Sequence, residues 1–221
     1  LAENNVGWVN LQKLVSKGHL EGMWYGKPRV DREILREYSE GIICLSGCIS
    51  GPINEWILQD QEDHAWETAQ ELLDIYGKEN LYLEIHNHGM EQQAKIRETL
   101  ANYAEKMDLK LVAANDVHFL HKEDHEAHDV MICIGTSRLL IDENRMRYTP
   151  EVYFKTAGEM RELFTEYPGA CDATLEIADR CNVEFVLDPT SSEKYPEYQP
   201  DDGSTPNDHF RKLCFEGLET R

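Results

Sequence analysis

Short apolar runs alternate along this chain with longer stretches of helical periodicity. Three runs have the apolar, β-branched or aromatic character of buried strands in a parallel sheet, at residues 42–45, 81–85 and 111–114. Between them, apolar residues recur at helical spacing over residues 53–58, 63–76 and 91–107. Strand, turn and helix thus follow one another three times. This order predicts an α/β fold with parallel strands, in an open sheet or a barrel.

The flanking regions add further expected elements. Apolar spacing predicts helices over residues 6–20, 32–38, 124–134, 158–164, 171–181 and 208–221, a loop over 23–28 and a short extended piece over 152–155. Residues 186–206 are rich in Pro, Ser and Asp, which is typical of a linker. We therefore expect a domain over 1–185, a linker over 186–206 and the first helix of another domain over 207–221. The start, Leu1-Ala2-Glu3, lacks a Met, which favours an excised piece of a longer protein.

Metal-competent side chains follow all three expected strands. Cys48 follows the first, His86 and His88 the second, and Asp116 and His118 the third. Because the carboxyl ends of parallel strands meet at one edge of a sheet, these side chains are expected to converge. Carboxylate, imidazole and thiolate are ligands of divalent metals, so the pattern predicts a metal site. The alternative is that Asp116 caps the next segment and His118 is a hydrogen-bonded core histidine.

Two other groups are weaker candidates. Arg145 and Arg147 flank Met146 in a charged loop, where they could contact phosphate or pair with the abundant acidic residues. His125 and His128 lie three residues apart on an expected helix, and this spacing can chelate a metal. We expect packing and capping roles for both histidines.

Composition limits the function classes. Lys plus Arg number 22 and Asp plus Glu number 42, a net charge of −20, whereas a free-standing nucleic-acid binder carries a basic face. Contact with nucleic acid would therefore need a metal site or a neighbouring basic domain. The six cysteines show no C-x-x-C pair, which favours reduced thiols of a cytoplasmic protein. No apolar run reaches membrane-spanning length.

Several motifs carry a resemblance to a known family: LAENNVGWVNLQKLVS, KPRVDREIL, LSGCISG, YLEIHNHG, LVAANDVHFL, EDHEAHDVMICI, NRMRY and ATLEIADRCNVEF. They resemble the polymerase-and-histidinol-phosphatase (PHP) domain of the bacterial replicative DNA polymerase, the polymerase III alpha subunit. The resemblance implies part of a distorted βα barrel with a cluster of divalent metals at its strand ends. Cys48, Asp116 and His118 match metal ligands of that family, and the earlier ligands lie upstream of LAENN. His86 and His88 match no ligand, so the resemblance places them beside the ligands.

The resemblance implies a DNA-directed DNA polymerase whose PHP domain is a metal-dependent phosphoesterase with 3′–5′ exonuclease activity. Divalent metals (zinc, manganese or magnesium, in a multinuclear site) would activate water and hold the phosphate, and no residue is assigned as a proton carrier. The implied partners are DNA, the sliding clamp, the clamp loader and a proofreading subunit, without a membrane. The segment alone is expected to be inactive because it holds only part of the ligand set. The alternatives are an inactive scaffold that docks a proofreading subunit and a free-standing phosphatase of small metabolites.

Overall fold

The computed structural model describes residues 1–187 and 198–221. Residues 188–197 of the expected linker (186–206) therefore lie outside the described residues. The chain divides into two compact units, Leu1–Glu184 and Phe185–Arg221. The second unit contains α9 (Pro206–Glu219), which Thr205 caps by accepting a hydrogen bond from the backbone N–H of Asp208. All the other described elements belong to the first unit.

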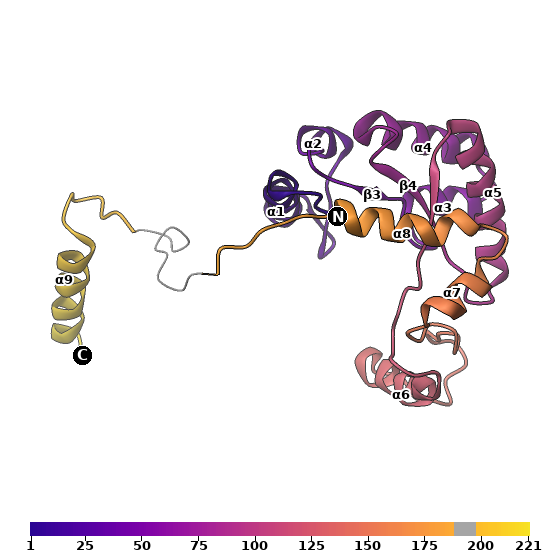
Figure 1. Ribbon diagram of the computed structural model, residues 1–221. Coiled ribbons are helices and arrows are strands. Elements are labelled where there is room, and N and C mark those ends of the chain that lie inside the picture. Colours follow the sequence, from indigo (N-terminus) through magenta and orange to yellow (C-terminus); the bar gives the residue numbers. More distant parts are fainter. Residues whose placement is uncertain (188–197) are drawn as a thin grey trace. The chain divides into compact units, whose positions relative to one another are not determined.

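A three-stranded parallel sheet is the centre of the first unit (Figure 1). It consists of β3 (Cys44–Leu45), β4 (Leu81–Ile85) and β5 (Lys110–Ala113), in the order β3-β4-β5. The strand register pairs Leu45 with Tyr82 and Ile85 with Ala113. This arrangement confirms the α/β class with parallel strands, and the described strands form an open sheet. β3 is shorter than expected because Ile42 pairs with Ala2 in an antiparallel bridge.

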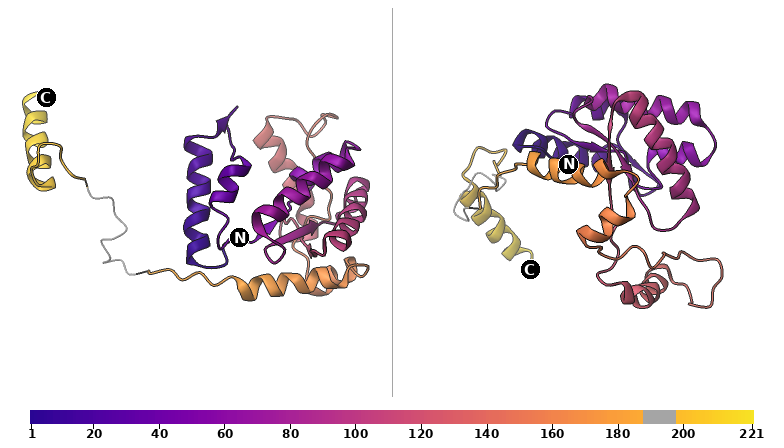
Figure 2. Two further views of the ribbon diagram at one scale, coloured as in Figure 1. Left: turned by 90° about the horizontal axis from the view of Figure 1, so that it is seen from above. Right: turned by 45° about the vertical axis from the view of Figure 1, so that its right-hand side comes forward.

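Helices cover both faces of the sheet (Figures 1 and 2). Alternate residues of β4 point to opposite faces, and each face has its own apolar cluster. Leu81, Leu83 and Ile85 pack in a cluster with residues of α3 (Pro52–Leu58), α4 (Glu62–Tyr76) and α5 (Glu91–Met107). Tyr82 packs with Ile43, Val112 and residues of α8 (Pro168–Arg180). Burial on both faces explains why the strand sequences lack regular polar alternation.

The remaining elements lie around this core. They are α1 (Asn5–Leu20), β1 (Met23–Trp24), β2 (Lys27–Pro28), α2 (Arg32–Glu37), η1 (Lys122–Asp124), α6 (His125–Thr136) and α7 (Ala157–Leu163). The expected loop over 23–28 is instead a β1–β2 hairpin. Its central residues, Tyr25 and Gly26, have φ of 47° and 74°, as a type I′ turn requires. None of the helices in the described parts of the chain is long and apolar enough to cross a membrane.

Residues 152–154, called the returning segment below, pack against the polypeptide that follows β5. The backbone N–H of His118 donates to the carbonyl of Val152 (2.8 Å), and the amide of Asn115 donates to the carbonyl of Tyr153 (2.9 Å). Phe119 and Tyr153 form a parallel bridge, consistent with the extended piece expected over 152–155. The structure therefore holds the polypeptide after β5 against residues 152–154.

The capping box of α7 anchors this returning segment. The carboxylate of Glu159 accepts hydrogen bonds from the Thr156 backbone N–H (2.8 Å) and from the Tyr153 hydroxyl (2.6 Å). These donors lower the pKa of Glu159 to about 2, with the Tyr153 hydroxyl as the largest cause. Because the folded pKa lies below the ordinary value, the carboxylate stabilises the fold above about pH 4.5, and this stabilisation is lost as pH falls toward 2.

We predict that Glu159→Gln lowers the urea midpoint of unfolding at pH 7, and that the difference from the unsubstituted chain shrinks between pH 4.5 and 2. Urea denaturation followed by circular dichroism at a series of pH values measures this difference. Glu162→Gln, an exposed position on the same helix, is the matched control and should not reproduce the pH-dependent difference. A midpoint difference that stays constant down to pH 2 would contradict the role of the charged carboxylate.

Candidate metal centre

The turn after β3 holds Cys48 in place through backbone contacts. Gly47 has a φ of 89°, and a Cβ on Gly51 would lie 2.6 Å from the carbonyl oxygen of Ser46. Both positions therefore need glycine, in the first case for the left-handed backbone and in the second for the close approach. The buried amide of Asn54 on α3 donates to the carbonyls of Cys48 (2.8 Å) and Gly47 (3.2 Å). Helix α3 thus fixes the turn that carries the thiol.

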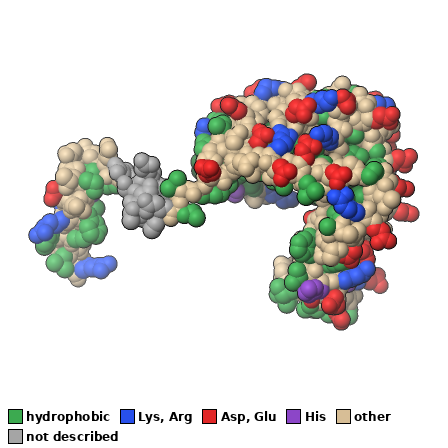
Figure 3. Space-filling view, in the orientation of Figure 1, with side chains coloured by type: hydrophobic (Ala, Val, Ile, Leu, Met, Phe, Trp, Pro, Cys, Tyr) green, Lys and Arg blue, Asp and Glu red, His purple; other side chains and the backbone are tan. Residues whose placement is uncertain are grey.

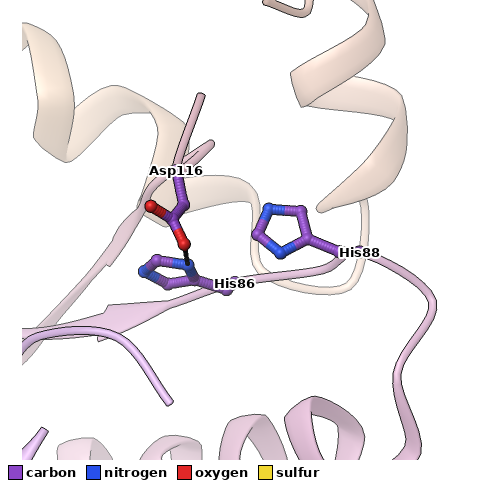
Figure 4. A group of neighbouring side chains, drawn as sticks. All are labelled: His86, His88 and Asp116. Carbon is purple, nitrogen blue, oxygen red and sulfur yellow. Dashed lines mark ion pairs between the residues drawn. The ribbon is translucent and has the colours of Figure 1, made fainter. Parts of the chain in front are cut away.

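His86 follows β4 and is buried, with a relative exposure of 6 %. Its Nε2 lies 2.6 Å from Oε1 of Glu84, which lies two residues earlier, within β4. Arg97 of α5 donates to the His86 carbonyl (2.7 Å) and so positions the backbone. The other ring nitrogen, Nδ1, is buried without a hydrogen-bond partner and lies 4.0 Å from Oδ2 of Asp116 (Figure 4).

Both ring nitrogens of His88 take part in hydrogen bonds. Nε2 lies 2.7 Å from the carbonyl of Asn115, which can only accept, so Nε2 carries the proton. Gln93 uses its Oε1 to accept from the His88 backbone N–H (2.7 Å), which directs its amide nitrogen to Nδ1 (2.9 Å). The lone pair of Nδ1 therefore accepts from Gln93. Burial lowers the pKa of His88, so the ring is neutral at pH 7.

The exit of β5 places Asp116 and His118 side by side. Asp116 has a φ of 50°, the left-handed conformation that Asp tolerates better than most residues. Nδ1 of His118 lies 2.8 Å from the Asp116 carbonyl, so Nδ1 carries the proton and the lone pair lies on Nε2. The same Nδ1 is 3.8 Å from Oδ1 of Asp116. A histidine that donates through one nitrogen to a carbonyl is well suited to bind metal through the other.

The structure brings most of the expected site residues to one edge of the sheet. One ligand atom from each of His86, His88 and Asp116 lies within 4.8 Å of the others. His118 is adjacent to Asp116, and Cys48 lines a small recess together with Glu84 and His86. The assignment of Cys48, Asp116 and His118 as ligands remains a prediction.

The sequence reasoning overlooked Glu84. A carboxylate inside a buried strand is unusual, and its place two residues before His86 puts both side chains on the same side of an extended chain. That spacing was a usable signal for a carboxylate–histidine pair.

Arg145 is engaged by an acidic partner. Its two terminal nitrogens lie 2.5 and 2.6 Å from the carboxylate oxygens of Asp129, and its side chain is 2 % exposed. Arg147 is exposed and donates to the carbonyl of Asp142 (3.1 Å). Arg145 therefore pairs with an acidic residue, one of the two roles considered from the sequence, and a phosphate contact by Arg147 stays a prediction. His125 hydrogen-bonds to the Tyr148 carbonyl through Nε2 (2.9 Å), which is the packing role expected for it.

The donor set fits a divalent cation. His86 presents a buried, unpartnered nitrogen toward a carboxylate, and His118 has its proton on the nitrogen that faces the Asp116 carbonyl. Imidazole nitrogen with carboxylate oxygen suits zinc or manganese better than magnesium. His88 does not fit as a ligand in this arrangement because Asn115 and Gln93 use both of its nitrogens.

We predict that Gln93→Leu lowers the free energy of unfolding by about 1–3 kcal/mol, the usual cost of leaving a buried polar group unpaired. The substitution would remove the partners of both the His88 backbone N–H and the His88 Nδ1. Urea denaturation measures the loss, and Gln92→Leu, at the exposed neighbouring position, is the matched control. Equal effects of the two substitutions would show that Gln93 does not secure His88.

Comparison with known proteins gives this edge of the sheet a family context. The family model described as "PHP domain" matches residues 1–88. The curated relatives include the DNA polymerase III subunit alpha of Treponema pallidum (strain Nichols), 38% identical over 223 residues, and that of Thermus aquaticus, 40% identical over 225 residues. The DNA polymerase III subunit alpha of Campylobacter jejuni is 34% identical over 246 residues. Each alignment covers 100% of this chain.

The chain spans 19%, 18% and 20% of the lengths of these three relatives. Residues 1–88 include β3, β4, Cys48, His86 and His88, so the matched PHP sequence reaches into the candidate metal centre. The similarity to the three subunits continues over the rest of the chain. The chain is therefore similar over its whole length to part of the bacterial DNA polymerase III alpha subunits, and its residues 1–88 match the PHP domain.

Proposed function

We propose that the chain acts as the PHP region of a longer replicative DNA polymerase III alpha subunit, a DNA-directed DNA polymerase. Similarity to such subunits over the whole chain supports this proposal. We further propose that the side chains that follow the three strands (Cys48, His86, Asp116 and His118) form a cluster that binds divalent cations. This cluster would hydrolyse the terminal phosphodiester bond of DNA as a 3′–5′ exonuclease. The observation that carries the second proposal is the proximity of the Asp116 carboxylate to ring nitrogens of both His86 (4.0 Å) and His118 (3.8 Å).

Each residue of the cluster has a defined part in the proposed chemistry. Asp116 and His118 would hold the cation through a carboxylate oxygen and Nε2, and Cys48 would add a thiolate from the turn after β3. A bound divalent cation supplies Lewis-acid activation of water and charge stabilisation at the phosphate. His88 and Gln93 hold the loop after β4 against Asn115, which keeps the ligand-bearing segments in register. No side chain of the cluster needs to carry a proton.

The charge of the chain limits how DNA could approach. The net charge is −20, and acidic side chains are spread over the visible face of the first unit (Figure 3). Such a surface repels a phosphate backbone at a distance, so DNA would be held by basic regions elsewhere in the longer protein. We propose DNA, the sliding clamp, the clamp loader and a proofreading subunit as partners, in the cytoplasm.

A second candidate function is a scaffold that docks a proofreading subunit. One observation favours it: large apolar side chains are exposed on α6 and in the loop after it. Met131, Ile134 and Ile141 are 65 %, 70 % and 83 % exposed. Exposed apolar groups of this kind are typical of protein-interaction surfaces. In a scaffold, the cluster after the strands would serve stability alone.

We predict that Asp116→Ala in the full-length protein lowers Mn²⁺-dependent release of 3′-terminal nucleotides from single-stranded DNA by at least roughly 100-fold. Loss of a partner of a ligand already costs about 10–100-fold in metal affinity or activity, and loss of a ligand should cost no less. Nucleotide addition should remain measurable because we assign the polymerisation chemistry to other parts of the longer protein. His118→Ala should behave in the same way.

Asp74→Ala, at an exposed position on α4, is the control and should leave trimming unchanged. The two candidate functions predict different outcomes for Asp116→Ala. If the variant loses trimming and nucleotide addition together and melts at a lower temperature, the scaffold is supported. If trimming continues at the normal rate, the cluster is not the site of phosphodiester hydrolysis.

A further inference from the structure

Three neighbouring side chains, the largely buried Glu84 and His86 and the exposed Asp116, form a row from β4 to the loop after β5 (Figure 4 shows the last two). We propose that His86 is a metal ligand through Nδ1 and that Glu84 is the carboxylate that orients it. His86 thus joins the centre in addition to the ligands matched by family resemblance. The inference deepens the proposed function and rests on its metal centre, while requiring no particular reaction there.

Glu84 fixes the proton of His86 on one nitrogen. Its side chain is 13 % exposed, and its Oε1 lies 2.6 Å from His86 Nε2. An ionised carboxylate can only accept a hydrogen bond, so Nε2 donates and the lone pair of the neutral ring lies on Nδ1. Carboxylates commonly orient metal-binding histidines in this way and raise the basicity of the free nitrogen.

The free nitrogen points into a position that needs a cation. His86 Nδ1 is buried without a hydrogen-bond partner, and Asp116 Oδ2 lies 4.0 Å away. This separation is too long for a hydrogen bond, so in the neutral ring two electron-rich atoms face each other. Tetrahedral zinc with ligand bonds of about 2.0–2.2 Å sets its ligand atoms about 3.3–3.6 Å apart, so a small approach of the two atoms would let them share one ion. One ion between the two atoms would satisfy both.

The principal alternative is a doubly protonated His86 that bridges Glu84 and Asp116 without any metal. In that case Nδ1 would donate to Asp116, and charged hydrogen bonds of this type are about 2.7–2.9 Å long. The 4.0 Å separation on the Asp116 side contrasts with 2.6 Å on the Glu84 side. This asymmetry favours a neutral ring with its proton on Nε2.

His88 provides an internal comparison two residues later. Its Nδ1 accepts from Gln93 and its Nε2 donates to Asn115, so the ring has no free lone pair. The two histidines follow the same strand and are both buried, yet only His86 keeps an unused nitrogen. The distinction predicts different responses of the two rings to a metal ion.

The first test is ¹⁵N NMR of the histidine side chains in the 221-residue chain at pH 7.5, before and after addition of Zn²⁺. We expect His86 with its proton on Nε2, and a shift of the Nδ1 resonance when Zn²⁺ is added. We expect no Zn²⁺-dependent shift for the ring nitrogens of His88. A proton on Nδ1 of His86 without metal, or an Nδ1 resonance that ignores Zn²⁺, would overturn the proposal.

The second test measures Zn²⁺ affinity by isothermal titration calorimetry. Glu84→Gln should weaken binding by about 10–100-fold, the usual effect of losing a carboxylate that orients a ligand. Glu79→Gln, an exposed glutamate just before the other end of β4, is the matched control and should leave the affinity within about twofold. Circular dichroism establishes that both variants are folded. Unchanged affinity in folded Glu84→Gln would overturn the role of Glu84.

These outcomes separate the inference from the proposed function. Zn²⁺ binding at His86 Nδ1 together with no metal-dependent trimming by the full-length protein would remove the exonuclease proposal and leave the ligand in place. Metal-dependent trimming that is abolished by Asp116→Ala, combined with an Nδ1 resonance that ignores Zn²⁺, would remove the ligand and leave the exonuclease. The NMR measurement on the unsubstituted chain does not depend on whether any variant folds.

Discussion

The position of β4 between two parallel neighbours is the constraint on which the candidate site depends. β4 is hydrogen-bonded to β3 on one side and to β5 on the other, and its apolar residues are fully buried. Because all three strands run in the same direction, the loops that follow them emerge at one edge. Cys48, His86 and Asp116 are separated by many residues in the sequence and share that edge for this reason. A reversed strand would carry its polar exit to the opposite end of the sheet.

Amide side chains hold each of the three exits. Asn54 donates to the turn after β3, Gln93 binds both the backbone and the ring of His88 after β4, and Asn115 after β5 donates to the Tyr153 carbonyl. An amide can donate and accept at once, and it is neutral. It therefore adds no positive charge that would pair with the carboxylates in place of a cation. The loops therefore have a defined shape while the negative charge of the centre is kept.

Most of the elements could be predicted from the sequence, whereas the state of each histidine could not. Buried apolar runs located 81–85 correctly and placed polar residues after each strand, because local periodicity reflects burial. The β1–β2 hairpin was missed since Tyr25 is an uncommon residue in a turn with positive φ. The distinction between His86 and His88 depends on Gln93 and Asn115, whose positions follow from the packing of α5 and β5. The spacing of His86 and His88 in the sequence does not reveal which ring keeps a free nitrogen.

The distribution of counter-charges gives the site a distinct electrostatic character. Elsewhere in the first unit, several carboxylates have Lys or Arg partners: Glu176 pairs with Lys110, and Asp129 pairs with Arg145. Within the described part of the chain, the ion pairs of Glu84 and Asp116 involve histidine and neither Lys nor Arg. Two carboxylates that share one neutral imidazole repel each other unless a cation intervenes. In a protein with a net charge of −20, a divalent ion bound at the proposed centre would relieve this repulsion.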